Sequence, residues 1–453
     1  MSKTIKLRKG LDIALKGEAD KVKSNVDAPA SFAIKPPDFH GLTPKMVVKV
    51  GDKVKAGSVI FYNKYKEEIQ FRSPVSGEVS EIVRGAKRRI LEVRITPDSE
   101  NQFEDLGAVK ADSMSSDEVK AYLLKNGLWP FLKMRPIDVI ANPEDKPKAI
   151  FISAFDTAPL APDYDFVLHG ENEAFQAGID ALTKLTEGKV HLTTRGGVSA
   201  DSCFTGAKGV QQNTVFGKHP AGNVGTQIHH IDPINKGEIV WTINAQDVAI
   251  IGRVMTSGQF DLSKVVAVTG SEVKNPKYVK TIVGSSISNI MENNVEGDNV
   301  RYISGNVLTG DKIPADGYLG YYSSQITVIP EGNEPKFMVT KGWMGPGAGK
   351  FSINRSYFSW LAPNKKRSLD TNLNGEVRAF VVTGEMEKVF PFDILPMQLV
   401  KSVMYNDLDL MENLGIYEVA PEDFALCEFV CTSKIEIQDI IRNGLDEVHR
   451  ECM

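Results

Sequence analysis

The sequence predicts a multidomain α/β protein, and three observations along the chain lead to that prediction. The first hundred residues alternate short β-branched runs with glycine turns, which is typical of a β-sandwich. The middle of the chain alternates strands with amphipathic helices, the pattern of an α/β layer with a largely parallel sheet. The part that follows is again rich in strands and contains one short helix, which favours a small β-grasp module.

The 453 residues therefore divide into five parts. In chain order, we expect a carrier-like β-sandwich at residues 1–100, a helical connector at 101–145, a Rossmann-like α/β domain at 146–258, a β-grasp (SLBB-like) module at 259–330, and a C-terminal region of loops and helices at 331–453. The length is ample for several hydrophobic cores, because domains are commonly about 100–200 residues long.

Composition is that of a soluble globular protein. Charged residues make up 25% and hydrophobic residues 42%, and the net charge of −5 offers no basic excess for binding nucleic acid. Four cysteines in so long a chain do not form a disulfide framework. The N-terminus lacks the apolar stretch of a secretory signal, and no apolar run approaches the ~20 residues of a membrane span. We therefore expect a soluble protein in a reducing cytosol that can dock on a membrane complex.

Two motifs in the first part indicate its fold. Residues Gly51–Gly57 have the pattern G-D-x-V-x-x-G, and Pro74–Val79 have the pattern P-V-x-G-x-V. This order resembles the lipoyl and biotinyl carrier fold, a flattened β-sandwich in which the glycines supply turns. Strands are expected at Val47–Val50 and Val59–Tyr62.

Lys66 occupies the position at which carriers bear their modified lysine, eight residues before Pro74. Its neighbours Tyr65 and Glu67 differ from the carrier pattern. Reuse of the fold without modification is therefore the favoured interpretation.

The connector contains a capped helix and an aromatic segment. Ser115 and Ser116 before two acidic residues predict a helix N-terminus, and Gly127 ends the helix. The segment Trp129–Pro136 that follows is aromatic, cationic and bounded by prolines. Either Trp129 and Phe131 pack a satellite core, or the segment forms an apolar slot for a flat ring with Arg135 as its polar anchor.

The central part alternates strands and helices without a nucleotide-binding motif. The glycine turn Arg195–Gly197 follows an expected strand but lacks the G-x-G-x-x-G pattern of dinucleotide-binding folds. Strands are expected at Ala149–Ile152, Lys189–Thr194 and Glu238–Ile243, and helices at Glu171–Thr186 and Gln246–Thr256.

The segment His219–Ile234 holds three of the seven histidines. Pro220, Gly222 and Gly225 interrupt a helical ladder, so we expect an ordered loop that leads into the next strand. Ordered loops are common binding sites. We do not expect a metal at His229 and His230, because adjacent positions on a strand point to opposite faces.

The last two parts are assigned from the same kinds of pattern. The module is expected to contain strands at Val265–Val268, Tyr278–Val283 and Asn299–Ser304 and a short helix at Ser285–Glu292. The C-terminal region is expected to contain helices at Leu395–Tyr405 and Ile435–Val448.

Cys427 and Cys431 have the x3 spacing of the last two cysteines in a ferredoxin-type cluster run. The first two positions of that run would be Pro421 and Phe424, which cannot bind iron. We therefore expect no cluster, and the spacing leaves open whether either cysteine keeps a redox role.

Several of these segments together resemble one family, the A subunit of the Na+-translocating NADH:quinone reductase (Na+-NQR) of bacterial respiratory membranes. The match extends over nearly the full length. It is carried by Ile5–Ile13, Gly51–Val54, Ser76–Gly77, Arg84–Arg88, Gly127–Pro130, Arg135–Pro136, His219–Pro233, Tyr417–Val419 and Ala425–Cys427.

The resemblance implies a peripheral subunit on the cytoplasmic face of the bacterial inner membrane. The complex passes electrons from NADH to quinone and exports sodium, and its other subunits, chiefly the integral membrane ones, are the implied partners. The family is similar to the C subunit of the Rnf complex and to the flavin-binding subunit of complex I. The family is linked to quinone binding, so quinone is the implied transient ligand, and no tightly bound flavin, iron–sulfur cluster or metal is expected.

The candidate quinone-binding residues are Trp129, Phe131 and Arg135, with His219 or His229 as a hydrogen-bond donor to a quinone oxygen. A reducible ring needs an apolar slot, one or two donors and eventually two protons. A histidine titrates near neutrality and can supply a proton. The alternative function is an iron–sulfur or lipoyl-type carrier related to the Rnf C subunit, which would use Cys427 and Cys431 or Lys66.

Overall fold

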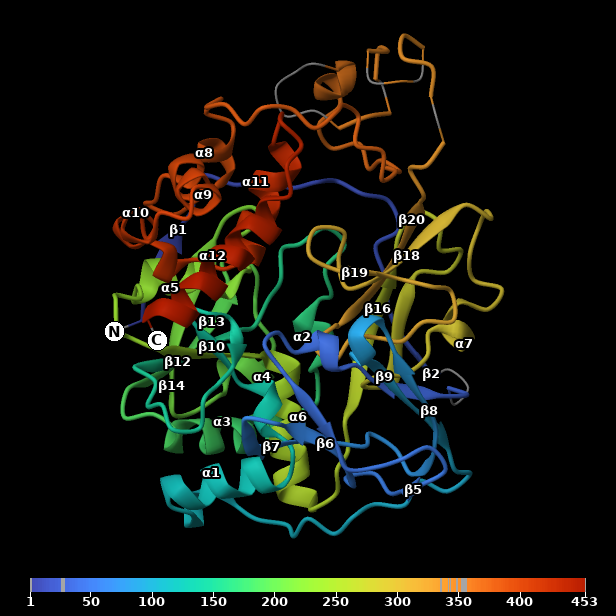
Figure 1. The fold of residues 1–453 in the computed structure, drawn as a ribbon, viewed down its shortest axis with the longest axis vertical. Helices are drawn as coiled ribbons and strands as arrows, with labels where there is room; N and C mark the ends of the chain where they lie inside the picture. The colour runs from blue at the N-terminus through green and yellow to red at the C-terminus, as the bar shows by residue number, and fades with distance from the viewer. Residues whose placement is uncertain are drawn as a thin grey trace.

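The computed structural model describes residues 2–452 apart from 26–28, 335, 341, 343, 348 and 352–356. Figure 1 shows a central sheet with helices on both faces, a strand-rich part beside it, and the C-terminal helices gathered over one face of the sheet. Within these residues, four sheets of seven, six, four and three strands form the framework.

The N-terminal domain is a β-sandwich of two small antiparallel sheets, in the orders β3-β9-β8-β5 and β4-β6-β7. Its strands and single-turn helices are β3 (Phe32–Ile34), η1 (Pro36–Asp38), β4 (Pro44–Met46), β5 (Lys53–Val54), β6 (Val59–Asn63), β7 (Lys66–Arg72), β8 (Gly77–Arg84), η2 (Ala86–Arg88) and β9 (Ile90–Pro97). Phe61, Phe71 and Val79 lie in its core. Lys66 is the first residue of β7, next to the two-residue turn at Lys64 and Tyr65.

The strand expected at Val47–Val50 does not form. The Asp52 carboxylate accepts the backbone N–H of Lys49 at 2.7 Å, and the Asp52 N–H returns to the Lys49 carbonyl at 3.1 Å. These two bonds close a turn that begins at Lys49, so the ladder stops early. The prediction was wrong because the turn around Gly51 already begins at Lys49, within the expected strand.

The first 25 residues contribute strands to two other sheets. β1 (Thr4–Lys6) pairs in parallel with β14, and β2 (Asp20–Asn25) pairs in parallel with β17. The N-terminal segment therefore ties the central sheet and the module together. These strands are short, basic and largely exposed, and such segments carry no periodic hydrophobic signal.

The connector begins with the predicted capped helix. The Ser115 hydroxyl accepts the N–H of Glu118, whose carboxylate accepts the Ser115 N–H at 2.7 Å. This reciprocal pair is a capping box. The elements of the connector are η3 (Ala111–Ser113), α1 (Ser116–Lys125), η4 (Trp129–Phe131), β10 (Lys133–Arg135) and β11 (Val139–Ile140).

The central sheet has the order β1-β14-β13-β12-β15-β10-β11. β1, β14, β13, β12 and β15 are parallel, and β10 and β11 add an antiparallel edge. The remaining elements of this layer are β12 (Ala149–Ser153), α2 (Tyr164–Val167), α3 (Asn172–Lys184), β13 (Lys189–Arg195), α4 (Ser202–Thr205), β14 (Val210–Phe216), α5 (Val224–Ile231), β15 (Val240–Asn244) and α6 (Ala245–Ser257). Every strand and helix predicted for this part is present.

Alternate residues of β12 face the two helical layers. Ile150 and Ile152 belong to the same core as α3 and α6, whereas Ala149 and Phe151 pack with Ile228 of α5. Figure 1 shows α3 and α6 on one face of the sheet and α5 on the other. The strand is buried on both faces, as strands of parallel sheets are.

Helix α5 lies inside the segment that the sequence predicted as a loop, and this prediction was wrong for residues 224–231. Pro220 and Gly222 precede the N-cap residue Asn223, so they do not interrupt the ladder. Gly225 lies in the first turn, where a Cβ would overlap the Asp423 carboxylate. The helix-breaking residues therefore precede the helix or make room for a neighbour.

The module is a six-stranded sheet in the order β19-β18-β20-β16-β17-β2. Its own elements are β16 (Ser263–Thr269), β17 (Lys277–Ile282), α7 (Ser288–Met291), β18 (Val300–Ser304), β19 (Asp311–Ile313) and β20 (Gln325–Pro330). The Gln246 side chain on α6 fastens it to the central layer, because its amide pairs with the Val265 backbone at 2.8 and 3.0 Å. Beside this contact, the fully buried Lys264 ammonium lies 3.2 Å from the Asp247 carboxylate.

In the C-terminal region, the described part of residues 331–385 is an irregular segment with one single-turn helix, and the helices that follow cover α5. Its elements are η5 (Phe358–Leu361), α8 (Met386–Val389), α9 (Pro396–Met404), α10 (Leu408–Asn413), η6 (Ile416–Glu418), η7 (Pro421–Phe424), α11 (Ala425–Val430) and α12 (Ile437–Cys452). Both predicted helices are present, as α9 and α12.

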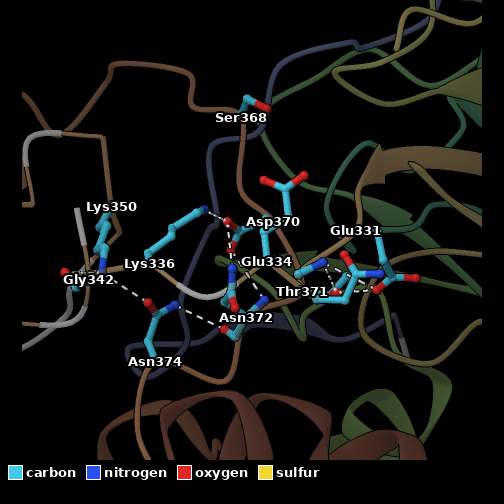
Figure 2. A network of polar contacts seen from close by, with 12 residues as sticks. Glu331, Glu334, Lys336, Gly342, Lys350, Ser368, Asp370, Thr371, Asn372 and Asn374 are labelled. Carbon is cyan, nitrogen blue, oxygen red and sulfur yellow. Dashed lines mark hydrogen bonds and ion pairs between the residues drawn. The ribbon is translucent and has the colours of Figure 1, made fainter. Parts of the chain in front are cut away.

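Glu331 fastens the irregular segment to the module. Its carboxylate accepts hydrogen bonds from Arg301 Nη2 and Lys312 Nζ, both at 2.6 Å, and from the Thr371 hydroxyl at 2.7 Å. Figure 2 shows Glu331 beside Thr371, and a second group around Asp370 that includes Lys336 and Asn372. The Arg301 and Lys312 cations and the Thr371 hydroxyl hold the pKa of Glu331 well below its usual range.

We expect the Glu331→Gln substitution to lower the free energy of unfolding by about 1 kcal/mol at pH 7, an ion-pair value discounted for solvent screening. Because the pKa is depressed in the folded state, the stabilisation is present above about pH 4.5 and is lost as the pH falls. Urea denaturation at pH 7 and pH 4 should therefore show a variant deficit that shrinks in acid. Glu334→Gln, three residues along the chain and exposed, is the matched control, and an equal deficit at both pH values would contradict the assignment.

Candidate functional site

A cavity of about 450 Å³ lies at the carboxyl ends of β12 and β15. On one side of β12 the sheet continues with β13 and β14, and on its other side lies β15. The chain order of the strands therefore reverses between β12 and β15. Ligands of open α/β sheets bind in the crevice at such a point. Ser153 and Asn244 end the two strands and line the cavity.

Regions outside the central layer contribute much of the wall. The connector contributes Phe131 and Lys133, and the module contributes hydroxyl and aromatic groups such as Ser323 and Tyr321. Phe131 stacks on Tyr321 with ring centroids 5.0 Å apart. The C-terminal region closes the rim with Glu422 and Gln438. The cavity therefore combines an aromatic wall with hydrogen-bonding groups.

His219 enters the cavity from the segment before α5. Its backbone N–H donates to the Asp12 carboxylate at 3.0 Å, and its carbonyl accepts the Leu11 N–H at 2.9 Å. The side-chain Nδ1 lies 3.1 Å from the Thr157 hydroxyl. Burial lowers the pKa of His219 to about 4, although Asp12 acts in the opposite direction. The imidazole is therefore neutral at neutral pH.

Gly222 allows the backbone to lie directly on the loop after β12. A Cβ at this position would lie 2.6 Å from the Thr157 nitrogen and 2.8 Å from the Asp156 Cα. Asp156 lines the cavity and accepts the Ala158 N–H at 2.8 Å. Burial raises the pKa of Asp156, partly offset by backbone N–H groups of its own loop. The carboxyl can therefore hold a proton more readily than an exposed aspartate.

Arg135 lines the cavity but is engaged in a buried ionic cluster. Nη2 contacts Glu422 at 2.5 Å, Nη1 contacts Asp423 at 3.4 Å, and Nε lies 3.6 Å from Asp138. Burial acts to raise the pKa of Asp138, but the Lys133 and Arg135 cations outweigh it and hold that pKa at about 2. The cluster joins the connector to the C-terminal region, with Arg135 and Asp423 enclosed and Glu422 partly exposed.

Two of the five candidate residues lie away from the cavity. Trp129 is fully buried, donates its indole N–H to the Ala141 carbonyl at 2.7 Å, and meets Trp241 edge to face. His229 contacts Glu418 through Nδ1 at 2.6 Å and accepts the Asp393 N–H through Nε2 at 3.0 Å. The structure brings Phe131, Arg135 and His219 together at the cavity.

The placement of His229 and His230 on opposite faces of a strand was wrong, because both lie on α5. The His230 Nδ1 lies 2.9 Å from the Thr226 carbonyl, a contact within the helix itself. Among the described residues, no group of three or more His, Cys, Asp or Glu side chains could hold a metal ion. Cys427 and Cys431 are both buried, and burial raises the pKa of Cys427 well above its ordinary value.

Sequence reasoning missed Asp156, Thr157 and Asn244. A usable signal existed for two of them, because Asp156 and Asn244 follow predicted strands at the edge where carboxyl ends meet. The module residues carried no such signal, because they reach the cavity from another sheet.

Family models match three stretches of the chain. They are the NqrA N-terminal barrel-sandwich hybrid domain at residues 5–98, the NqrA second alpha/beta domain at 114–260, and the NQRA C-terminal domain, of the SLBB type, at 265–315. Relatives named as the A subunit of Na(+)-translocating NADH-quinone reductase are 37% identical over 450 residues in Hahella chejuensis and 38% identical over 453 residues in Yersinia pestis. Both alignments cover 99% of this chain and 100% of the relative.

The chain belongs to the A-subunit family of the Na(+)-translocating NADH-quinone reductases. It is a multidomain α/β protein with a barrel-sandwich domain, a second α/β domain and an SLBB domain, as the family models divide it. A solved NAD+-reducing [NiFe]-hydrogenase in the H2-reduced state is 13% identical over 75% of this chain and 65% of that chain, with a TM-score of 0.38. That likeness is too low to indicate function.

The cavity lies between the matched second and third NqrA domains, and its rim reaches the C-terminal region beyond the last match. In the part of the chain that the structure describes, no helix has the length and apolar character to cross a membrane.

Proposed function

We propose that this chain is the A subunit of a Na+-translocating NADH:quinone reductase and contributes to quinone binding, quinone reduction and assembly of the complex. The observation that carries the proposal is the match to relatives of that name over the whole of both chains. The chain supplies the quinone-facing part of a reaction whose electrons come from NADH through other subunits.

The cavity at β12 and β15 is the proposed position of the quinone headgroup. Its volume of about 450 Å³ lies within the range of small-molecule sites, roughly 300–1,000 Å³. Phe131 and Tyr321 offer a flat aromatic wall, and His219 adds a neutral imidazole to the lining. A quinone needs this combination, because its ring is apolar and its two carbonyl oxygens accept hydrogen bonds.

Reduction of a quinone to a quinol adds two electrons and two protons. In our proposal the chain's own groups orient the ring and handle protons at its oxygens. Asp156, whose pKa is raised by burial, can take up and release a proton beside the cavity, and His219 donates a hydrogen bond. Arg135 supports the site indirectly, since its guanidinium is occupied by three carboxylates.

The finer features of the family are part of the same proposal. The central layer is Rossmann-like, which the strand order β14-β13-β12-β15 supports. The partners are the integral membrane subunits, and the chain lies on the cytoplasmic face of the inner membrane. Quinone is a transient ligand, and no flavin, iron–sulfur cluster or metal is bound tightly, as the missing glycine fingerprint and cysteine run indicate.

Filling the cavity tests its role. We expect the Ser323→Trp substitution to raise the KM for a short-chain quinone at least tenfold in the purified complex, because the indole occupies the space of the headgroup. Rates are normalised to NADH oxidation with ferricyanide, which reports electron entry. Ser257→Trp, on the exposed end of α6, is the matched control. An unchanged quinone KM in a correctly assembled Ser323→Trp complex would show that quinone binds elsewhere.

A further inference from the structure

The Thr157 hydroxyl has one proton, and its neighbours indicate where that proton goes. Its oxygen accepts the Gly222 N–H at 2.9 Å, and His219 Nδ1 lies 3.1 Å away. No other hydrogen-bond acceptor for this hydroxyl lies among the described residues. If Nδ1 carried a proton, the oxygen would accept two bonds and its own O–H would remain unused. Donation from the hydroxyl to Nδ1 satisfies all three groups.

The tautomer of His219 follows from this bond. Burial lowers the pKa of His219, so the ring carries a single proton at neutral pH. An Nδ1 that accepts the Thr157 proton must be bare, which leaves the ring proton on Nε2. His219 is among the residues that line the cavity, and Thr157 is not. The nitrogen that remains for a ligand is therefore a donor.

The surrounding backbone holds both partners in place. The Leu11 N–H donates to the His219 carbonyl, and the Asp12 carboxylate accepts the His219 N–H. The Gly222 backbone lies so close to Asp156 and Thr157 that a side chain at position 222 would overlap their backbone. These contacts restrict the movement of the backbone that carries the ring and the hydroxyl.

We infer that Thr157 is a positioning residue that holds His219 as the Nε2–H tautomer, so that His219 donates a hydrogen bond to a carbonyl oxygen of the ligand in the cavity. The assignment of a quinone as that ligand rests on the proposed function above. A carbonyl oxygen can accept this hydrogen bond, whereas a ligand group that can only donate meets a second donor at this point and binds weakly.

Nitrogen-15 NMR of the full chain labelled in its histidines tests the tautomer without any ligand. The His219 signals are assigned by their loss in His219→Gln. We expect the native chain and Thr157→Ser to show a protonated Nε2 and a bare Nδ1, and Thr157→Val to show a mixture of the two tautomers. A native His219 protonated at Nδ1, or a Thr157→Val spectrum equal to the native one, would overturn the inference.

Quinone kinetics in the assembled complex test the consequence. We expect Thr157→Val to raise the quinone KM about tenfold and Thr157→Ser to restore it within about twofold, since serine keeps the hydroxyl. If Ser323→Trp raises the KM but Thr157→Val does not, the donor role of His219 fails while the cavity remains the quinone site. If Ser323→Trp has no effect, the proposed site itself fails, and the NMR result stands separately.

Discussion

Replacing Arg135 with methionine should lower the free energy of unfolding of the central and C-terminal parts by about 3–5 kcal/mol, the cost of leaving a buried charge without its partner. The guanidinium is only 3% exposed and compensates Asp138, Asp423 and Glu422. Asp423 is fully enclosed, and methionine cannot neutralise it. Urea denaturation followed by tryptophan fluorescence measures the loss, because Trp129 and Trp241 lie in the layer that Arg135 supports.

Two further variants separate charge compensation from packing. Lys133→Ala removes a cation on the same strand that is a third exposed, so we expect a loss below about 1 kcal/mol. Adding Asp423→Asn to Arg135→Met should recover part of the stability, since asparagine can still accept the Ala420 N–H that Asp423 now binds at 2.9 Å. The free energy of unfolding of Asp423→Asn alone completes the comparison. If Asp423→Asn lowers it by the same amount in the native chain and in the Arg135→Met chain, the two residues are not coupled.

The Gly252→Ala substitution should destabilise the central domain by about 3 kcal/mol, the upper end of the usual cost of overpacking. α3 and α6 touch through glycines at this point. A Cβ on Gly252 would overlap the Ala174 carbonyl oxygen and lie 2.6 Å from the Gly178 nitrogen. The contact is with backbone, so no side chain can move aside. The helices must separate and lose contacts along the whole interface between them.

Gly349→Ala is the matched control, because a Cβ there meets nothing within 4 Å. It should leave the urea midpoint within error of the native chain. Thermal and urea denaturation of the two variants provide the comparison. If the Gly252→Ala chain were as stable as the control, α3 and α6 could move apart without loss of stability. That outcome would contradict the prediction.

The elements with a periodic hydrophobic pattern were predictable. α3, α6, β12 and β13 lie within one or two residues of the sequence assignment, because each buries a regular face. α5 was missed since its glycine serves a contact with Asp423, a residue about 200 positions away. β1 and β2 were missed because their stability comes from the edge of a sheet built by other parts of the chain.

The residue candidates for the site also divide into those that the structure places at the cavity and those that it places elsewhere. Phe131 and Arg135 stood out as an aromatic and cationic pair, and His219 as a histidine in a glycine-rich segment, and all three line the cavity. Trp129 and His229 carried the same signals, yet the structure places one in the core and the other against Glu418 and Asp393. Residue type indicates what a side chain can do, whereas only its neighbours decide whether a ligand can reach it.

The sequence by itself determined the domain types, the main helices and strands and the family, because these depend on local periodicity and on motifs that survive in linear order. Only the tertiary structure decided where the cavity lies, which candidates line it, and that Thr157 faces His219. These features join residues separated by tens to hundreds of positions, and no local pattern encodes such pairings. A hydrogen bond of 3.1 Å between two loops depends on every strand that places them.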